Sequence, residues 1–128
     1  MDERERHAAG MRMRREVFGD EHVDRAEATK SELNADFQDL ITRYAWGEIW
    51  SRPELPRHTR SLLTIGLLVA LNREEELRMH LKAARNNGVS VEELKEVLLH
   101  CAIYCGVPAA NAAFRAMSEI LNEGEGEK

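Results

Sequence analysis

The sequence predicts an all-α protein, and three features of its composition support this fold class. Proline is rare, with three in 128 residues, and most of the eight glycines stand at the edges of apolar segments. Alanine, leucine, glutamate and arginine, which favour helices, dominate the chain. No segment alternates apolar and polar residues as a half-buried strand would. We therefore expect about six helices in a single domain, residues 1–121.

The N-terminal third is expected to contain two helices. The first covers residues 3–18, has a weakly amphipathic face and ends at a glycine. Residues 21–30 are polar and are interpreted as a connector or a short turn of helix. The second helix is expected over residues 31–50, with Ser31 as its N-cap. Its predicted core stripe consists of four residues at helical spacing: Phe37, Leu40, Ile41 and Tyr44.

Two prolines in residues 51–56 must interrupt the helix, and a third helix is expected over residues 57–71. It is polar in its first turn and apolar nearly all round afterwards. A helix that is apolar on all sides needs covering on all sides. This feature favours a homo-oligomer and a central helix in a compact monomer about equally.

The C-terminal half carries clear helix-boundary signals. Residues 74–87 begin with three glutamates, which suit the positive end of the helix dipole, and Gly88 supplies a left-handed cap. Ser90 then begins a capping box for a helix that ends near residue 104. A last helix is expected over residues 108–121. The tail, residues 122–128, has no apolar residue and is predicted to be disordered and acidic.

The charge balance excludes several classes of partner. Eighteen lysines and arginines stand against 23 aspartates and glutamates, so the formal net charge is −5. A nucleic-acid-binding protein should carry a basic excess, so we expect no nucleic-acid partner. The longest apolar run, residues 62–71, is too short to span a bilayer, and we expect no membrane association. Two cysteines and no apolar signal segment indicate a cytoplasmic protein.

Cys101 and Cys105 lie four residues apart on one face of a predicted helix. A redox dithiol normally has two intervening residues, with its first cysteine at a helix N-terminus that stabilises the thiolate. Here three residues intervene, and the pair lies deep in an apolar helix. We interpret both as small buried apolar residues, and we expect no metal site.

His80 is the histidine whose context suggests chemistry. It shares a helix face with Glu76, one turn earlier, and stands at the edge of an apolar stripe. A histidine beside a carboxylate can act as a general acid or base near neutral pH. The alternative is a partly buried histidine that simply pairs with Glu76.

A second candidate face combines Arg43, Trp46 and Trp50. Two indoles with an arginine can line a pocket for a flat organic anion. They can equally form a subunit contact, since tryptophan and arginine are enriched there. Arg60 follows close in sequence, and an arginine pairs with a carboxylate in a planar, bidentate geometry that suits a dicarboxylate.

Four runs resemble the carboxymuconolactone decarboxylase family in their order and spacing. They are residues 43–50 (RYAWGEIW), 59–65 (TRSLLTI), 83–89 (AARNNGV) and 102–111 (AIYCGVPAAN). The resemblance extends over residues 10–121. It implies an alkylhydroperoxidase-D-like helical fold, a ring-shaped homohexamer, and no cofactor or metal. It also implies decarboxylation of a dicarboxylate lactone, 4-carboxymuconolactone, to 3-oxoadipate enol-lactone in the protocatechuate branch of the β-ketoadipate pathway.

Peroxide-reducing members of the wider superfamily carry a glutamate, two cysteines and a histidine. In this chain the corresponding positions hold, in order, Ser61, Arg73, Glu76 and His80. Only the histidine is present, and the two cysteines of this chain lie on the next helix. The departure favours a decarboxylase over a thiol-dependent peroxidase or disulfide reductase. A non-catalytic helical oligomerisation module, with the tryptophan face as its interface, is the other alternative.

Resemblance and residue chemistry together suggest a role for each candidate. His80 would donate the proton, with Glu76 orienting its imidazole. Arg60 or Arg43 would anchor the acetate arm of the substrate. The other candidates are Trp46 and Trp50, as an apolar wall beside the departing CO2, and Tyr104, as a hydrogen bond to the lactone carbonyl. Only the role of His80 is supported by a superfamily position that holds the same residue type; the other roles follow from residue chemistry and proximity in sequence.

Overall fold

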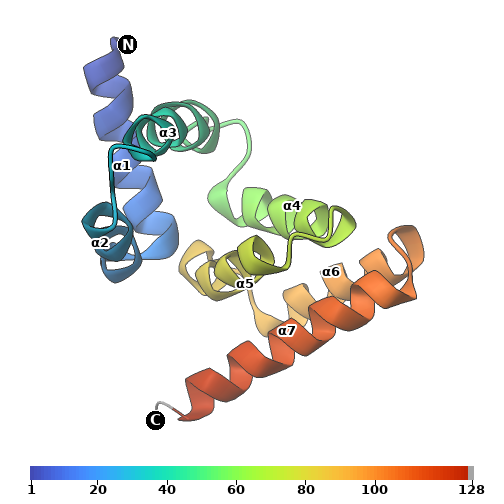
Figure 1. Ribbon diagram of the computed structural model, residues 1–128. Helices are drawn as coiled ribbons and strands as arrows, with labels where there is room; N and C mark the ends of the chain where they lie inside the picture. The colour runs from blue at the N-terminus through green and yellow to red at the C-terminus, as the bar shows by residue number, and fades with distance from the viewer. Residues whose placement is uncertain (127–128) are drawn as a thin grey trace. The chain divides into compact units, whose positions relative to one another are not determined.

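The computed structural model describes residues 1–126, and these contain helices and no strand (Figure 1). The all-α fold class is therefore confirmed. Contacts divide the chain into two compact units, Met1–Arg57 and His58–Lys128. Each unit is described by itself, and a single domain over residues 1–121 stays a prediction.

The first unit begins with α1 (Glu3–Phe18), which matches the predicted helix. Local signals set both of its ends. The Asp2 side chain accepts a hydrogen bond from the backbone N–H of Glu5 at 2.8 Å, which caps the N-terminus. Gly19 follows the last turn with a φ of 89°, a conformation that favours glycine and stops the helix.

α2 (Asp20–Ala28) replaces the connector that was predicted for residues 21–30. Two acidic residues in its first turn suit the positive end of the helix dipole. Val23 is fully buried, and Arg25 pairs with Glu21 one turn earlier at 2.9 Å. Of the two interpretations, the connector was wrong and the short turn of helix was nearer, because one buried valine gives no visible periodicity in the sequence.

α3 (Ala35–Ile41) continues directly into η1 (Thr42–Trp50), a π-helical stretch. The helix predicted over residues 31–50 therefore exists, but it starts four residues late. Ser31 is not its N-cap, because its backbone N–H donates to the Asn34 side chain at 2.8 Å within a turn.

The core stripe predicted for this helix is wrong. Phe37, Leu40 and Tyr44 are 58%, 47% and 41% exposed, and Ile41 is only half-buried. The residues that η1 buries are Thr42, Trp46 and Gly47. Hydrogen bonds in a π-helix join residues five apart instead of four, so the buried face departs from the 3.6-residue pattern.

α1 and η1 cross at unusually short range, and two glycines make this possible. A Cβ atom on Gly10 would lie 1.8 Å from the Thr42 carbonyl oxygen, and one on Gly47 would lie 2.4 Å from the Arg6 carbonyl oxygen. No side chain fits at either position. The backbones of the two helices therefore contact each other directly.

Arg14 of α1 is buried, with 6% of its surface exposed. Its guanidinium donates to Gln38 Oε1 at 3.0 Å and to Thr42 Oγ1 at 3.3 Å, so it joins α1 to both α3 and η1. Burial lowers its pKa, and the nearby charge of Glu27 opposes that shift.

The second unit contains a helical hairpin of α4 (Arg57–Ala70) and α5 (Glu74–Ala83), and α5 continues as the 3₁₀ turn η2 (Ala84–Asn87). These bounds agree with the two predicted helices to within a residue. The connecting loop is short, and Asn72 within it has a φ of 57°. A short loop makes α4 and α5 antiparallel neighbours, as Figure 1 shows.

α6 (Val91–Tyr104) and α7 (Val107–Gly126) complete the second unit as a longer antiparallel hairpin (Figure 1). The predicted capping box is confirmed: the Ser90 side chain accepts from the Glu93 backbone, and Glu93 accepts from the Ser90 backbone at 3.0 Å. Gly88 has the expected left-handed conformation, with a φ of 79°.

The last helix extends beyond the predicted end at residue 121. Residues 122–126 of the tail that was predicted to be disordered are helical instead. An ion pair between Lys82 and Glu123 at 3.5 Å joins this extension to α5. Residues 127–128, which complete the predicted tail, lie outside the described residues.

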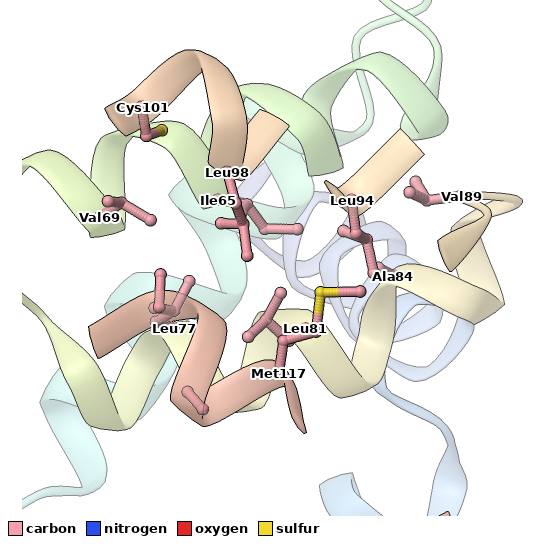
Figure 2. Close-up of a cluster of buried hydrophobic side chains, with 12 residues drawn as sticks. Ile65, Val69, Leu77, Leu81, Ala84, Val89, Leu94, Leu98, Cys101 and Met117 are labelled. Carbon is pink, nitrogen blue, oxygen red and sulfur yellow. The ribbon is translucent and has the colours of Figure 1, made fainter. Parts of the chain in front are cut away.

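One apolar core holds the four helices of the second unit together. Its buried members are Ile65, Val69, Leu77, Leu81, Ala84, Val89, Leu94, Leu98, Cys101, Ala113, Ala116 and Met117. In Figure 2, Val69 and Leu77 lie at one side of this core, Ile65 and Leu81 in the middle, and Ala84 at the other side. All four helices of the unit, and η2, contribute to this core.

Candidate active site

Trp46 and Trp50 lie on η1 in the first unit. Trp46 is buried, with its ring centroid 5.0 Å from that of Trp50 and 5.2 Å from that of Phe18, which meets it edge-on. These aromatic contacts are favourable beyond their area burial. Trp46 therefore belongs to the packing of its own unit, whereas Trp50 is half-buried and keeps part of its ring accessible.

Arg43 also lies on η1, and its charge has a partner within the unit. Its Nε lies 3.3 Å from a carboxylate oxygen of Glu3, and its guanidinium lies over the Tyr44 ring at 5.9 Å. Glu3 also accepts from the Tyr44 hydroxyl at 2.9 Å and pairs with Arg6, so Arg43 belongs to a small polar network within its own unit.

Arg60 lies on α4 and His80 on α5, both in the second unit. Arg60 directly precedes the buried Ser61, and His80 directly precedes the buried Leu81. Both side chains are half-buried, which suits groups that bind a small ligand.

The other two candidates of this unit are exposed. Glu76 lies one turn before His80 on the outer part of α5. Tyr104 is 78% exposed at the end of α6 and stacks on His100 with a centroid separation of 4.8 Å.

A groove of about 720 Å³ lies between α4 and α6. Its apolar wall consists of Leu62, Leu63, Gly66, Leu67 and Val97, and its polar rim of Thr59, Glu92, Glu93, Glu96, His100 and Cys101. Three carboxylates along one rim repel a dianion. The groove therefore suits an apolar partner better than a dicarboxylate.

His58 and Glu93 form a pair that sequence reasoning missed. The His58 Nε2 atom lies 2.7 Å from a carboxylate oxygen of Glu93, and this contact joins the first turns of α4 and α6. The pKa of Glu93 lies below its usual value. The main cause is the hydrogen bond from the Ser90 backbone N–H, and the contact with His58 adds to it. No local signal could reveal the pair, because its members are 35 residues apart.

Both cysteines are free thiols. Cys101 is buried and Cys105 is half-buried. Burial, together with the neighbouring Cys105, raises the pKa of Cys101 to about 11. A neutral thiol is a poor nucleophile, so this pair does not suit a dithiol reductase.

The described residues contain no group of three or more histidine, cysteine, aspartate or glutamate side chains that could hold a metal ion. Within the same residues, no helix is both long and apolar enough to cross a membrane.

Comparison with known proteins places these residues in a family. The model of the carboxymuconolactone decarboxylase family matches residues 35–119, about two-thirds of the chain. A 4-carboxymuconolactone decarboxylase from Acinetobacter baylyi is 53% identical over 123 residues, which cover 96% of this chain and 92% of that protein. The chain belongs to the carboxymuconolactone decarboxylase family. All seven candidate site residues lie within the matched segment.

Two further relatives show the range of the family. A nitrosuccinic acid decarboxylase from Metarhizium robertsii is 40% identical over 114 residues, 89% of this chain and 80% of that protein. A 4-carboxymuconolactone decarboxylase sequence from Pseudomonas putida is 50% identical over 48 residues, 38% of this chain and all of that sequence. Both of these relatives are named as decarboxylases.

Proposed function

We propose that this chain decarboxylates 4-carboxymuconolactone to 3-oxoadipate enol-lactone and CO2, without a cofactor, in the protocatechuate branch of the β-ketoadipate pathway. The observation that carries the proposal is the 53% identity to the Acinetobacter baylyi decarboxylase over nearly the whole of both chains. The lower identity to the nitrosuccinic acid decarboxylase makes that acid the second candidate substrate.

The proposed reaction needs no external electron sink. The bond between the ring carbon and the departing carboxylate breaks, and its electron pair moves through the ring double bond onto the lactone carbonyl oxygen. A proton then adds to the carbon next to that carbonyl. The protein must supply an anion anchor, donors to the carbonyl oxygen, and a proton.

We assign the proton to His80, with Glu76 as a positioning residue one turn earlier. Arg60 or Arg43 holds the acetate arm, because a cation on the departing carboxylate would stabilise the substrate against decarboxylation. Trp50, with Trp46 behind it, supplies an apolar surface that favours neutral CO2. The half-buried positions of Arg60 and His80, both in the second unit, support this assignment.

His80→Gln tests the proton-donor role. General acid catalysis is worth about 10²–10⁴-fold, so kcat should fall at least tenfold with the oligomer intact. The measurement is the loss of 4-carboxymuconolactone absorbance.

The matched control is His7→Gln, a histidine near Asp39 in the first unit, which should keep wild-type turnover. Added imidazole should return part of the rate to a His80→Ala variant. Near-normal turnover by His80→Gln would remove His80 from the mechanism. Wild-type protein that consumes neither 4-carboxymuconolactone nor nitrosuccinic acid would favour a non-catalytic helical module.

We also propose that the chain works in the cytoplasm as a homohexamer. The free thiols of Cys101 and Cys105 are consistent with a reducing compartment. The apolar side chains that α4 and α6 expose around their groove support self-association. The number of six subunits comes from the family resemblance.

A further inference from the structure

A second cavity of the second unit, of about 560 Å³, shares no lining residue with the groove between α4 and α6. Residues of α5, η2, α6 and α7 line it, so we call it the α7 cavity after the helix that contributes most of them. Its volume lies within the range of about 300–1,000 Å³ that is typical of sites for small organic ligands.

The walls of the α7 cavity are apolar and reach the core of the unit. Its six apolar lining residues are Leu81, Leu94 and Met117 of the core and, packed against that core, Val91, Ile120 and Leu121. The three core residues are drawn in Figure 2, and none of them is more than 6% exposed. An apolar group that entered the cavity would therefore leave water and contact these side chains.

The charged residues that line the α7 cavity are two cations and one carboxylate. Lys82 pairs with that carboxylate, Glu123, at 3.5 Å. Arg85 is exposed and has no ion-pair partner among residues 1–126. An arginine guanidinium binds a carboxylate through two parallel hydrogen bonds, so Arg85 is the group available to an anion.

The groove between α4 and α6 shows the opposite charge beside a similar apolar wall. Its lining residues include Glu92, Glu93 and Glu96 and no lysine or arginine. Like charges repel an anion there, whereas Lys82 and Arg85 attract one to the α7 cavity. An anionic ligand should therefore distinguish the two.

We propose that the α7 cavity binds a monocarboxylic acid with an extended apolar chain, as a medium-chain fatty acid has. Arg85 pairs with the carboxylate, Lys82 adds positive charge beside it, and the chain lies against Leu81, Leu94 and Met117. The site is separate from the proposed decarboxylation, no step of which uses these residues. Because the ligand would contact η2, α6 and α7 together, its binding should stabilise the folded chain.

A dicarboxylate lactone fits the α7 cavity poorly. With one carboxylate on Arg85, its second carboxylate would lie against apolar walls, because Lys82 is already paired with Glu123. Burying a charge without a partner is costly. A chain with a single terminal carboxylate avoids that cost and places only apolar groups inside.

The test is isothermal titration calorimetry of the full-length protein with decanoate, below the concentration at which decanoate forms micelles. We expect saturable binding, and a Tm that rises with decanoate concentration. Arg85→Gln should raise the Kd by about tenfold or more, because hydrogen bonds between charged groups are lost. Glu123→Gln should lower the Kd by about two- to fivefold, because it removes a like charge and frees Lys82.

Arg78→Gln is the matched control on the same helix. Arg78 pairs with Glu74 and Glu119 and does not line the cavity, so its loss should leave the Kd unchanged. The alcohol 1-decanol, which has the same chain without the charge, should bind about tenfold more weakly than decanoate or worse. Leu121→Trp places an indole in the cavity and should abolish binding. If that variant does not fold, Arg85→Gln and Glu123→Gln still decide, because both residues are exposed.

The outcomes separate this site from the proposed function. A Kd for decanoate that is the same in Arg85→Gln and wild type, or the same for decanol and decanoate, would overturn the α7 site. If Arg85→Gln loses both decanoate binding and turnover of 4-carboxymuconolactone, the cavity belongs to the decarboxylation site and a separate ligand site is overturned. Decanoate binding that follows these expectations would support the α7 site even in a protein without decarboxylase activity, which would overturn the proposed function alone.

Discussion

At the scale of single residues, the environment of a side chain decides its chemistry. Cys101 and Cys105 are two neighbouring thiols, as a redox pair would be, but burial keeps the Cys101 thiol protonated. His80 and Arg60, by contrast, are half-buried, so they combine contact with the core and access for a ligand. The same residue types would therefore have different roles at other positions.

Cys101 should resist alkylation. With a pKa of about 11, about one thiol in a thousand is ionised at pH 8, and the thiolate is the reactive form. The rate of iodoacetamide labelling at Cys101 should rise about tenfold per pH unit between pH 7 and 9. Peptide mapping by mass spectrometry measures it, with Cys105→Ser as the control. Rapid labelling of Cys101 at pH 7 would contradict the shift.

At the scale of elements, helix ends follow from local sequence and helix faces do not. The capping box at Ser90 and the glycine after α5 mark boundaries because the groups that bond lie within a few residues of each other. The buried face of η1 depends on its π-helical turn and on α1, which crosses it. That is why the stripe of Phe37, Leu40 and Tyr44 was mistaken for core.

Two glycine substitutions should have opposite effects. Gly10→Ala forces α1 away from the Thr42 carbonyl oxygen, and we expect it to lower the free energy of unfolding by about 1–3 kcal/mol or more. Gly66→Ala, in the middle of α4, meets nothing within 4 Å and should raise it by up to about 1 kcal/mol. Urea unfolding measures both. Equal effects would contradict the close crossing of α1 and η1.

At the scale of the whole molecule, the face formed by α4 and α6 exposes more apolar side chains than the surface of a monomer needs. Leu63, Leu67, Leu99 and Ile103 are all exposed, and the first two line the groove between α4 and α6. Large exposed apolar patches mark interaction sites. The helix predicted over residues 57–71, which is apolar nearly all round, therefore still exposes apolar side chains in the folded chain.

Charges on this face should dissociate the proposed oligomer. Leu67→Glu and Ile103→Glu each place a carboxylate on an apolar surface, where it cannot be desolvated cheaply. We expect either variant to elute at a lower mass by size-exclusion chromatography with light scattering. Ala28→Glu, on the polar surface of α2, should leave the mass unchanged. If Leu67→Glu and Ile103→Glu both elute at the wild-type mass, this face is excluded as the interface.

The sequence by itself determined the all-α class, most helix ends and the family. Those properties depend on local hydrogen bonds, backbone preferences and the order of short motifs, all of which are written along the chain. The tertiary structure decided which faces are buried. It paired His58 with Glu93, and it joined Arg14 to Gln38 and Thr42. These contacts join residues far apart in sequence, and only the packing of whole helices brings them together.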